Sequence, residues 1–476
     1  MDILIKNGII VTMDPIRRVI MDGAVAVEKD HIIDVGPSPE LEKSHSADLE
    51  IDARGMVALP GLMDGHAHAG HSLLRSLGMH NDTWYKACEV IYAEASTEEF
   101  WEVDALLTYL EHLRFGTTCG VTFFGGGDSV MRVDDPVYAR RHCEAAEKVG
   151  VRTFLAVGPR RPPFPSKYAR WSEGTRRDRM ASFEEQVDTC EKIIEQNHGT
   201  AQGRVKIAMM LPTPHPENKP ITVAELDDLK QQSSTVRGIS RREDLMFTMD
   251  GHSRGTVEFC HRELDLLGPE ALFSHSTELT EEEIRLLAET GTKVAHNPSA
   301  VASMLGRCPV PELLDAGVTV VLGSDAGAPD RSYDMFRHMF QCMRYHRRHY
   351  RDPRVLPPGK VLEMATIDGA RAFREDTSLG SLEAGKKADI VLVDMRKPHL
   401  HPLNMPVDRL TYYANGNDVD TVIVDGRVLM MAGEVKTMDI HSVLEQADQE
   451  IEAAVGRSGL KDLYETTDRY WGHSRY

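Results

Sequence analysis

Histidines and aspartates gather at four places in the sequence where an apolar run ends. His66 and His68 end the segment GLMDGHAH, and the motifs DGH, SHS and GSDA end three later runs. In an extended strand the side chains of residues i and i+2 point to the same face, so His66 and His68 can hold one ion together. The three later motifs add the candidate residues Asp250, His252, His275 and Asp325.

Imidazoles and a carboxylate can hold a divalent ion and leave one position open for water, whose pKa then falls from about 16 toward 7. Asp325 can bond to both the ion and the water. It is therefore the natural group to take the proton of the water and pass it to a leaving amine. His275 can polarise the carbonyl or imine group that is attacked. These residue types predict metal-dependent hydrolysis.

The elements that must position these residues read as a parallel α/β fold. Between residues 60 and 375, apolar strand-like runs alternate with amphipathic helical segments. Eight runs read as strands, namely GLMDGHAH, TTCGVTFFG, VRTFLAVG, RVKIAMMLP, DLMFTMDGH, ALFSHS, TKVAHNPS and VTVVLGSD. Eight such units predict a closed (β/α)8 TIM barrel, in which the chemistry takes place at the carboxyl ends of the strands.

Helical segments lie between these runs. In TEEEIRLLAETG, Thr280 is a predicted N-cap and Glu283 completes a capping box. Short strands broken by turn residues make up both ends of the chain. We expect residues 1–59 and 376–438 to form one small β-sandwich domain, residues 60–375 to form the barrel, and residues 439–476 to form a charged helical tail.

Composition excludes several classes of partner. Of 476 residues, 55 are Lys or Arg and 74 are Asp or Glu, so the net charge of −19 repels nucleic acid and anionic membranes. No run of about 18 apolar residues is present, and the N-terminus does not resemble a signal peptide. The seven scattered cysteines form no CxxC pair. We expect a cytoplasmic protein with reduced thiols, whose basic run of residues 344–354 is a solvated helix face or a subunit contact.

Beyond these single residues, the chain resembles the amidohydrolase superfamily, particularly the group that contains cytosine, guanine and S-adenosylhomocysteine deaminases and triazine chlorohydrolases. The likeness covers almost the whole length and rests on KNGIIVTMD, ALPGLMDGHAHAGHSLLRSLG, HNPSA, LGSDAGAPDRSYDMF and LGSLEAGKKADIVLVD. It implies that His66, His68, His252 and Asp325 bind one metal ion, with His275 beside it. It also implies a homodimer or a larger homo-oligomer. Zinc is the default ion, although iron(II), cobalt and manganese suit the same donors.

One position departs from the pattern of this group. Its deaminases usually carry a glutamate three residues after the strand-five histidine, whereas Gly255 stands three residues after His252. Either Glu278, three residues after His275, replaces this acid, or the reaction needs no such acid. A carboxylate at Glu278 is also explained by the dipole of the helix that follows it.

The missing glutamate divides the functional hypotheses. Cleavage of an amide, urea or carbamate can dispense with it, because Asp325 can itself carry the proton. We therefore expect hydrolysis of a carbonyl C–N bond in a small molecule, as in the similar hydrolases of phenylurea and thiocarbamate herbicides. The alternative is a deaminase or dechlorinase of an aminated purine, pterin, pyrimidine or triazine. A second alternative is a non-catalytic metal- or ligand-binding barrel, against which the presence of Asp325 argues.

Substrate contacts and the number of metal ions can also be predicted. His71 after the HAH motif, His215 in TPHP and His296 in HNPSA are candidate substrate-binding residues. The Arg- and Pro-rich insertion of residues 157–179 is a candidate lid. In the superfamily a second ion needs a carboxylated lysine at the end of strand four. Lys206 stands near the start of that strand, so we expect one ion per chain.

Overall fold

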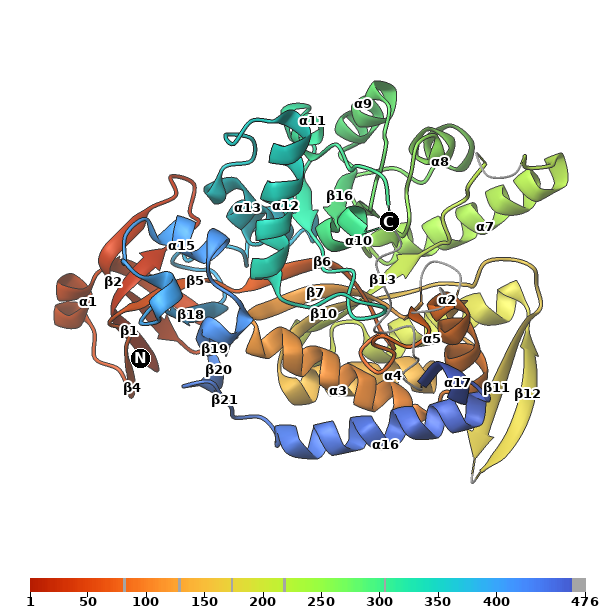
Figure 1. The fold of residues 1–476 in the computed structure, drawn as a ribbon, viewed down its shortest axis with the longest axis horizontal. Coiled ribbons are helices and arrows are strands. Elements are labelled where there is room, and N and C mark those ends of the chain that lie inside the picture. The colour runs from red at the N-terminus through yellow and green to blue at the C-terminus, as the bar shows by residue number, and fades with distance from the viewer. Residues whose placement is uncertain (80–82, 127–129, 173, 217–219, 304, 465–476) are drawn as a thin grey trace, which may run out of the picture.

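A parallel sheet of eight strands is the central element of the computed structural model, which describes residues 1–79, 83–126, 130–172, 174–216, 220–303 and 305–464 (Figure 1). Each strand pairs in parallel with the next, and β17 lies beside β6, so the sheet closes on itself as a TIM-like barrel. The eight predicted strands are confirmed. They are β6 (Leu62–His68), β7 (Thr117–Phe123), β10 (Arg152–Val157), β13 (Val205–Met210), β14 (Phe247–Met249), β15 (Ala271–Ser274), β16 (Lys293–His296) and β17 (Val320–Leu322).

Helices link the strands and cover the outside of the barrel (Figure 1). Because helices cover the outside of the sheet and side chains fill the inside, the strands are mainly apolar, and every residue of β7 is buried. The helices of this layer are α2 (Trp84–Val90), the π-helix Ile91–Ala95, α3 (Glu98–Arg114), α4 (Pro136–Val149), α5 (Phe183–Asn197), α7 (Val223–Arg242), α8 (Thr256–Leu264), α9 (Glu281–Thr290), α10 (Pro298–Ser303), α11 (Val310–Asp315), α12 (Met335–Tyr350), α13 (Pro358–Met364) and α14 (Ile367–Ala372).

The predicted capping box at the start of α9 is confirmed. The Thr280 hydroxyl accepts the backbone N–H of Glu283, and the Glu283 carboxylate accepts the backbone N–H of Thr280. The second oxygen of this carboxylate accepts the N–H groups of Gly255 and Val257, at 2.8 and 3.2 Å. Glu283 therefore caps α8 as well as α9, which fixes the loop after β14 against the loop after β15.

The two ends of the chain meet in one mixed sheet of nine strands beside the barrel (Figure 1). Ile5 and Val25 share an apolar cluster with Ile390 and Ile423, so burial of these side chains holds the two ends together. The predicted small β-region built from both ends is confirmed, and its strands form one continuous sheet. They are β1 (Ile3–Val11), β2 (Val19–Glu28), β3 (His31–Pro37), β4 (Leu49–Asp52), β5 (Met56–Pro60), β18 (Ile390–Asp394), β19 (Val419–Val424), β20 (Arg427–Met431) and β21 (Glu434–Val435), with α1 (Ser38–Ser44) and α15 (Pro406–Tyr412) beside them.

Buried ion pairs join this sheet to the amino-terminal end of the barrel. Arg152 Nε lies 2.8 Å from Asp389 Oδ2, and Arg204 Nη1 lies 3.2 Å from Asp425 Oδ2. All four side chains are buried. Buried charges are stable only when paired, so these contacts fix the position of the barrel on the sheet and leave its other end open for a site.

Two further elements lie outside the barrel. Helix α16 (Ile440–Ser458) packs along α3 and is followed by α17 (Lys461–Tyr464). Strands β11 (Ser166–Ser172) and β12 (Thr175–Ala181) form a hairpin that overlaps the predicted lid segment and ends two residues beyond it. Within the described ranges, no helix combines the length and the apolar composition that crossing a membrane requires.

Candidate active site

The carboxyl ends of four barrel strands bring five side chains together. His66 and His68 lie at the end of β6, Asp250 directly follows β14, His275 directly follows β15, and Asp325 follows β17. All five side chains are buried. We call these residues the carboxylate cluster.

Short distances connect the members of the carboxylate cluster. Asp250 Oδ1 lies 3.3 Å from His66 Nε2 and 3.0 Å from His275 Nε2, and Asp250 Oδ2 lies 3.6 Å from His68 Nε2. Asp325 Oδ1 lies 3.1 Å from His68 Nε2 and 3.5 Å from His66 Nε2. The two carboxylates thus face the same imidazoles.

Backbone hydrogen bonds between β6 and the segment after β17, where the barrel closes, create this arrangement. The N–H of Asp325 donates to the carbonyl of His66 at 2.8 Å, and the N–H of His68 donates to the carbonyl of Ala326 at 3.1 Å. Buried Asp64 strengthens the joint, because its carboxylate accepts the N–H and the hydroxyl of Ser324, at 2.8 and 2.5 Å. Closing the ring therefore places Asp325 beside the two histidines of β6.

The electrostatics of the cluster favour a bound cation. Burial opposes the charged form of His66, but Asp250 and Asp325 raise its pKa to about 10. Burial also opposes ionisation of the two carboxyl groups. Nevertheless, the histidines around Asp250 hold its pKa well below the usual range, and Arg331 and the histidines do the same for Asp325. Arg331 Nε lies 3.0 Å from Asp325 Oδ2. Two ionised carboxylates thus converge on imidazoles inside the barrel.

The donor set fits a divalent metal ion. Ligand atoms of His66, His68 and Asp250 all lie within 4.8 Å of one another, and so do those of His66, His275 and Asp325. Nitrogen and carboxylate donors in this combination suit zinc, iron(II), cobalt or manganese. Lys206 offers no bridge to a second ion here, because its ammonium group pairs with Glu375.

The predicted ligand His252 is in neither of these two sets. Its Nε2 atom is buried without a hydrogen-bond partner among the described residues, and Asp250, two residues earlier, faces the imidazoles. Strand β14 ends at Met249, so Asp250 is the first residue beyond the strand. Gly251, with a φ of +80°, then turns the chain away. The ring of His252 stacks on Phe273 with centroids 4.0 Å apart, and its Nδ1 atom lies 3.0 Å from Thr256 Oγ1.

Two of the three predicted substrate contacts lie near the carboxylate cluster. His71 is buried, its ring stacks on that of His68 with centroids 4.7 Å apart, and its Nδ1 atom lies 2.6 Å from the Tyr92 hydroxyl. His215 lies against Gly251 on the loop after β13. It lines a cleft together with Arg161, Phe164 and Ile221, among other residues.

The third predicted substrate contact, His296, and the predicted acid, Glu278, have different neighbours. His296 ends β16, and its ring lies beside that of His346, with centroids 5.3 Å apart. Glu278 is exposed, and its carboxylate accepts the backbone N–H of Arg307 at 2.6 Å. Glu278 is therefore bound to the segment before α11 and does not belong to the carboxylate cluster.

Three residues of the site were not singled out from the sequence. Asp64 supports the closure of the barrel, Arg331 pairs with Asp325, and Asn297 Nδ2 lies 3.4 Å from both ring nitrogens of His275. Asn297 and Arg331 stand within the quoted segments HNPSA and LGSDAGAPDRSYDMF, but nothing in their spacing shows what they touch.

The predicted lid is only partly available for a substrate. In the β11–β12 hairpin, Arg176 pairs with Glu94 and Asp178, and Arg170 pairs with Asp135. These arginines hold the hairpin on the barrel.

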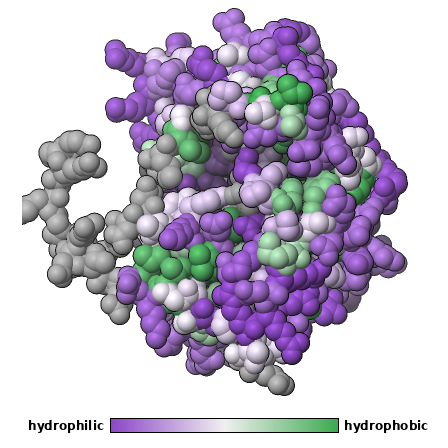
Figure 2. Space-filling model, turned by 90° about the vertical axis from the view of Figure 1, so that its right-hand side faces the viewer, coloured by the Kyte–Doolittle hydropathy of each residue, from purple (hydrophilic) through white to green (hydrophobic). Residues whose placement is uncertain are grey.

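On the right-hand side of the view in Figure 1, apolar patches interrupt a mainly hydrophilic surface around a recessed centre (Figure 2).

Comparisons with known proteins agree with this architecture. The model of the amidohydrolase family matches residues 57–429. The chain is 32% identical over 454 residues to a 5-methylthioadenosine/S-adenosylhomocysteine deaminase of Syntrophobacter fumaroxidans, covering 94% of this chain and 96% of that protein. It is 30% identical over 473 residues to a 5′-deoxyadenosine deaminase of Methanosarcina mazei, covering 96% and 99%.

Solved structures share the fold. An adenosine deaminase from Xanthomonas campestris with bound zinc superposes with a TM-score of 0.79 at 23% identity, covering 96% of this chain and 99% of that one. Atrazine chlorohydrolase from Arthrobacter aurescens, complexed with zinc, gives 0.74 at 21% identity, with coverage of 94% and 100%. The match to the family model and the full-length relatives confirm the resemblance seen in the sequence: the chain belongs to the amidohydrolase family.

Proposed function

We propose that the protein is a zinc-dependent deaminase of adenosine-type nucleosides modified at the 5′ position. Family membership makes it a hydrolase of carbon–nitrogen bonds other than peptide bonds. The relatives that are 30 to 32% identical over nearly the full length are deaminases of methylthioadenosine, S-adenosylhomocysteine and 5′-deoxyadenosine. They favour the deaminase alternative over cleavage of an amide, urea or carbamate.

The carboxylate cluster carries this proposal. Asp325 Oδ1 lies 3.1 Å from His68 Nε2, and its pKa is held low, so the residue is an ionised base beside the candidate metal ligands. We assign the ligand role to His66, His68, Asp250 and Asp325, with His275 beside them. An ion held there would supply a Lewis acid that lowers the pKa of a water molecule.

Asp325 then moves the proton. Its carboxylate accepts a proton from the attacking water and returns it to the leaving amine, which departs as ammonia. His275 Nε2, 3.0 Å from Asp250 Oδ1, is oriented toward the same centre and can hold the attacking oxygen. These roles need no side chain beyond those that the barrel closure brings together.

His71 is the group best placed to donate a hydrogen bond to the purine ring. Burial raises the pKa of Tyr92 well above its usual range, so this phenol keeps its proton and can donate it to His71 Nδ1, 2.6 Å away. Burial and His68 hold the pKa of His71 well below its usual range, so the ring is neutral. The Nε2–H of His71 then remains as a donor, and Ser253, three residues after Asp250, provides no carboxyl group for this task.

Ammonia release divides the hypotheses. Zinc-loaded protein is incubated with 5′-methylthioadenosine, 5′-deoxyadenosine and S-adenosylhomocysteine, and in parallel with a phenylurea and a carbamate. We expect ammonia from the nucleosides, together with the change in ultraviolet absorbance that conversion of a 6-aminopurine to a 6-oxopurine produces. Cleavage of the urea or carbamate without deamination would contradict the proposal. A lack of turnover with every compound, in protein shown to hold zinc, would favour a binding protein.

A further inference from the structure

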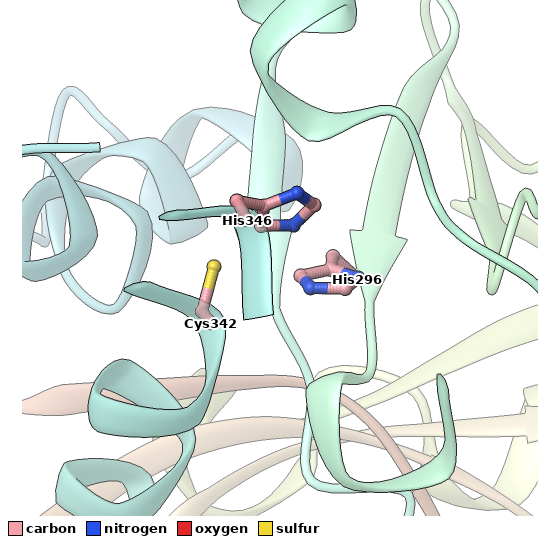
Figure 3. Close-up of side chains that lie close together, drawn as sticks. All are labelled: His296, Cys342 and His346. Atoms are coloured by element: carbon pink, nitrogen blue, oxygen red, sulfur yellow. The ribbon is translucent and has the colours of Figure 1, made fainter. Parts of the chain in front are cut away.

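A second group of metal-ligand side chains lies between β16 and α12. His296 ends the strand, Cys342 and His346 stand one turn apart on the helix, and the three side chains point toward one another (Figure 3). One ligand atom from each lies within 4.8 Å of the other two. All three side chains are 0% exposed. We call these residues the thiol cluster.

The imidazoles of this cluster lack partners. Neither ring nitrogen of His296 or of His346 has a hydrogen-bond partner among the described residues, although all four atoms are buried. Buried polar side chains are nearly always hydrogen-bonded, because leaving a donor unpaired away from water is unfavourable. Two such rings side by side therefore point to a bound group that the nitrogens hold.

The donor types in this cluster suit zinc. Zinc binds both thiolate sulfur and imidazole nitrogen, and Cys342, His296 and His346 provide one sulfur and two nitrogen donors.

We propose that His296, Cys342 and His346 bind a zinc ion at a structural site separate from the active site. On binding, the Cys342 thiol releases its proton to solvent and the thiolate sulfur bonds to the ion, while the imidazoles bind as neutral rings. Burial already keeps His346 neutral, with a pKa lowered to about 3. The sequence predicts one ion per chain, and this site raises the number to two.

The position of the ion indicates a structural role. Helix α12 begins directly after Asp334, nine residues beyond Asp325, and β16 runs into Asn297, which contacts His275. An ion between β16 and α12 would tie the helix that follows the eighth strand to the end of the seventh. It would thereby stiffen the frame of the carboxylate cluster without facing a substrate. The inference does not depend on which molecule the enzyme deaminates.

Cobalt(II) loading tests the site, because a thiolate bound to cobalt gives a charge-transfer absorption in the near ultraviolet that carboxylate and imidazole ligands do not give. The carboxylate cluster contains no cysteine, so the absorption reports the thiol cluster alone. We expect metal-free protein to take up about two equivalents of cobalt and to develop this absorption. Uptake of one equivalent without the absorption would overturn the proposal.

Single substitutions test which residues produce the thiolate absorption. Cys342→Ser and His346→Gln are expected to remove the thiolate absorption and one equivalent of metal, whereas Cys190→Ser, in which another fully buried free cysteine is changed, should keep both. His66→Ala should lose the other equivalent and keep the absorption. Persistence of the absorption in Cys342→Ser would contradict the assignment, and the wild-type measurement stands even if a variant does not fold.

Discussion

Two clusters of buried histidines lie at the ends of barrel strands, and different groups accompany the imidazoles in each. In the carboxylate cluster, Asp250 and Asp325 face the histidines and are each 6% exposed. In the thiol cluster, Cys342 faces His296 and His346, and all three are fully buried. Carboxylate donors with some access to solvent suit an ion that works on water, whereas a fully buried set with a sulfur donor suits an ion that holds structure. The groups beside the imidazoles, and not the imidazoles themselves, distinguish the two roles.

The largest expected effect comes from Asp325→Asn. This change removes the base and weakens a metal ligand, so we expect ammonia release to fall by about 10²- to 10⁴-fold. The rate is measured on protein loaded with zinc, and the thiolate absorption of the cobalt form serves as the control for folding. A variant that keeps the wild-type rate would remove Asp325 from its assigned role.

A matched pair of variants at the end of β14 decides which residue is the ligand. Asp250→Asn is expected to lower activity and zinc affinity at the carboxylate cluster by at least about 100-fold, and His252→Gln by less than about tenfold. The physical reason is that Asp250 faces three imidazoles while His252 stacks on Phe273. The reverse order of effects would restore His252 as the ligand.

Cys342→Ser sharpens the contrast between catalysis and stability. At free zinc about 100 times the Kd, an ion that binds only the folded state adds about 2.7 kcal/mol to the free energy of unfolding. We expect zinc to raise the Tm of wild type more than that of Cys342→Ser, by a few degrees. Ammonia release should change far less than in Asp325→Asn. An equal zinc-dependent rise in both proteins would argue against a structural ion.

The smallest effect is expected for Glu278→Gln. Its carboxylate is exposed and accepts the N–H of Arg307, so its removal should change ammonia release by less than about twofold. The measurement compares kcat and KM for 5′-methylthioadenosine. A large loss in kcat would show that Glu278 replaces the missing deaminase acid after all.

Much of the fold could be predicted from local patterns. Alternation of apolar runs with amphipathic segments identified all eight barrel strands, because strands buried on both faces are mainly apolar. The capping box of Thr280 and Glu283 was equally local and is confirmed. That Glu283 also caps α8 could not be predicted, since this contact joins two different loops.

The site was harder to predict because it depends on single-residue positions. Asp250 and His252 would face the same side of a continuing strand, but β14 ends at Met249 and the chain turns at Gly251. Asp250 therefore faces the imidazoles, whereas the ring of His252 stacks on Phe273. The sequence shows both residues and does not fix the end of the strand. The positions of His66, His68 and Asp325 depend less on where a strand ends. Backbone hydrogen bonds at the closure of the barrel hold the segments of these residues beside one another.

The thiol cluster could not be predicted from the sequence for a different reason. Cys342 and His346 are spaced for one helix face, but His296 is 46 residues before Cys342 in the chain, and only the packing of α12 on the barrel brings them together. The run from Arg344 to Arg354 indicated a solvated face. That holds for Arg344 and Arg348, which are exposed, while the opposite face of the same helix buries His346.

The measurement that tests the account most directly is the rate of ammonia release from 5′-methylthioadenosine by zinc-loaded wild type and by His66→Ala. We expect release by wild type and a loss of activity in the variant, even though the cobalt form of the variant keeps its thiolate absorption. Deamination by His66→Ala at the wild-type rate, or no deamination by fully loaded wild type, would contradict catalysis at the carboxylate cluster.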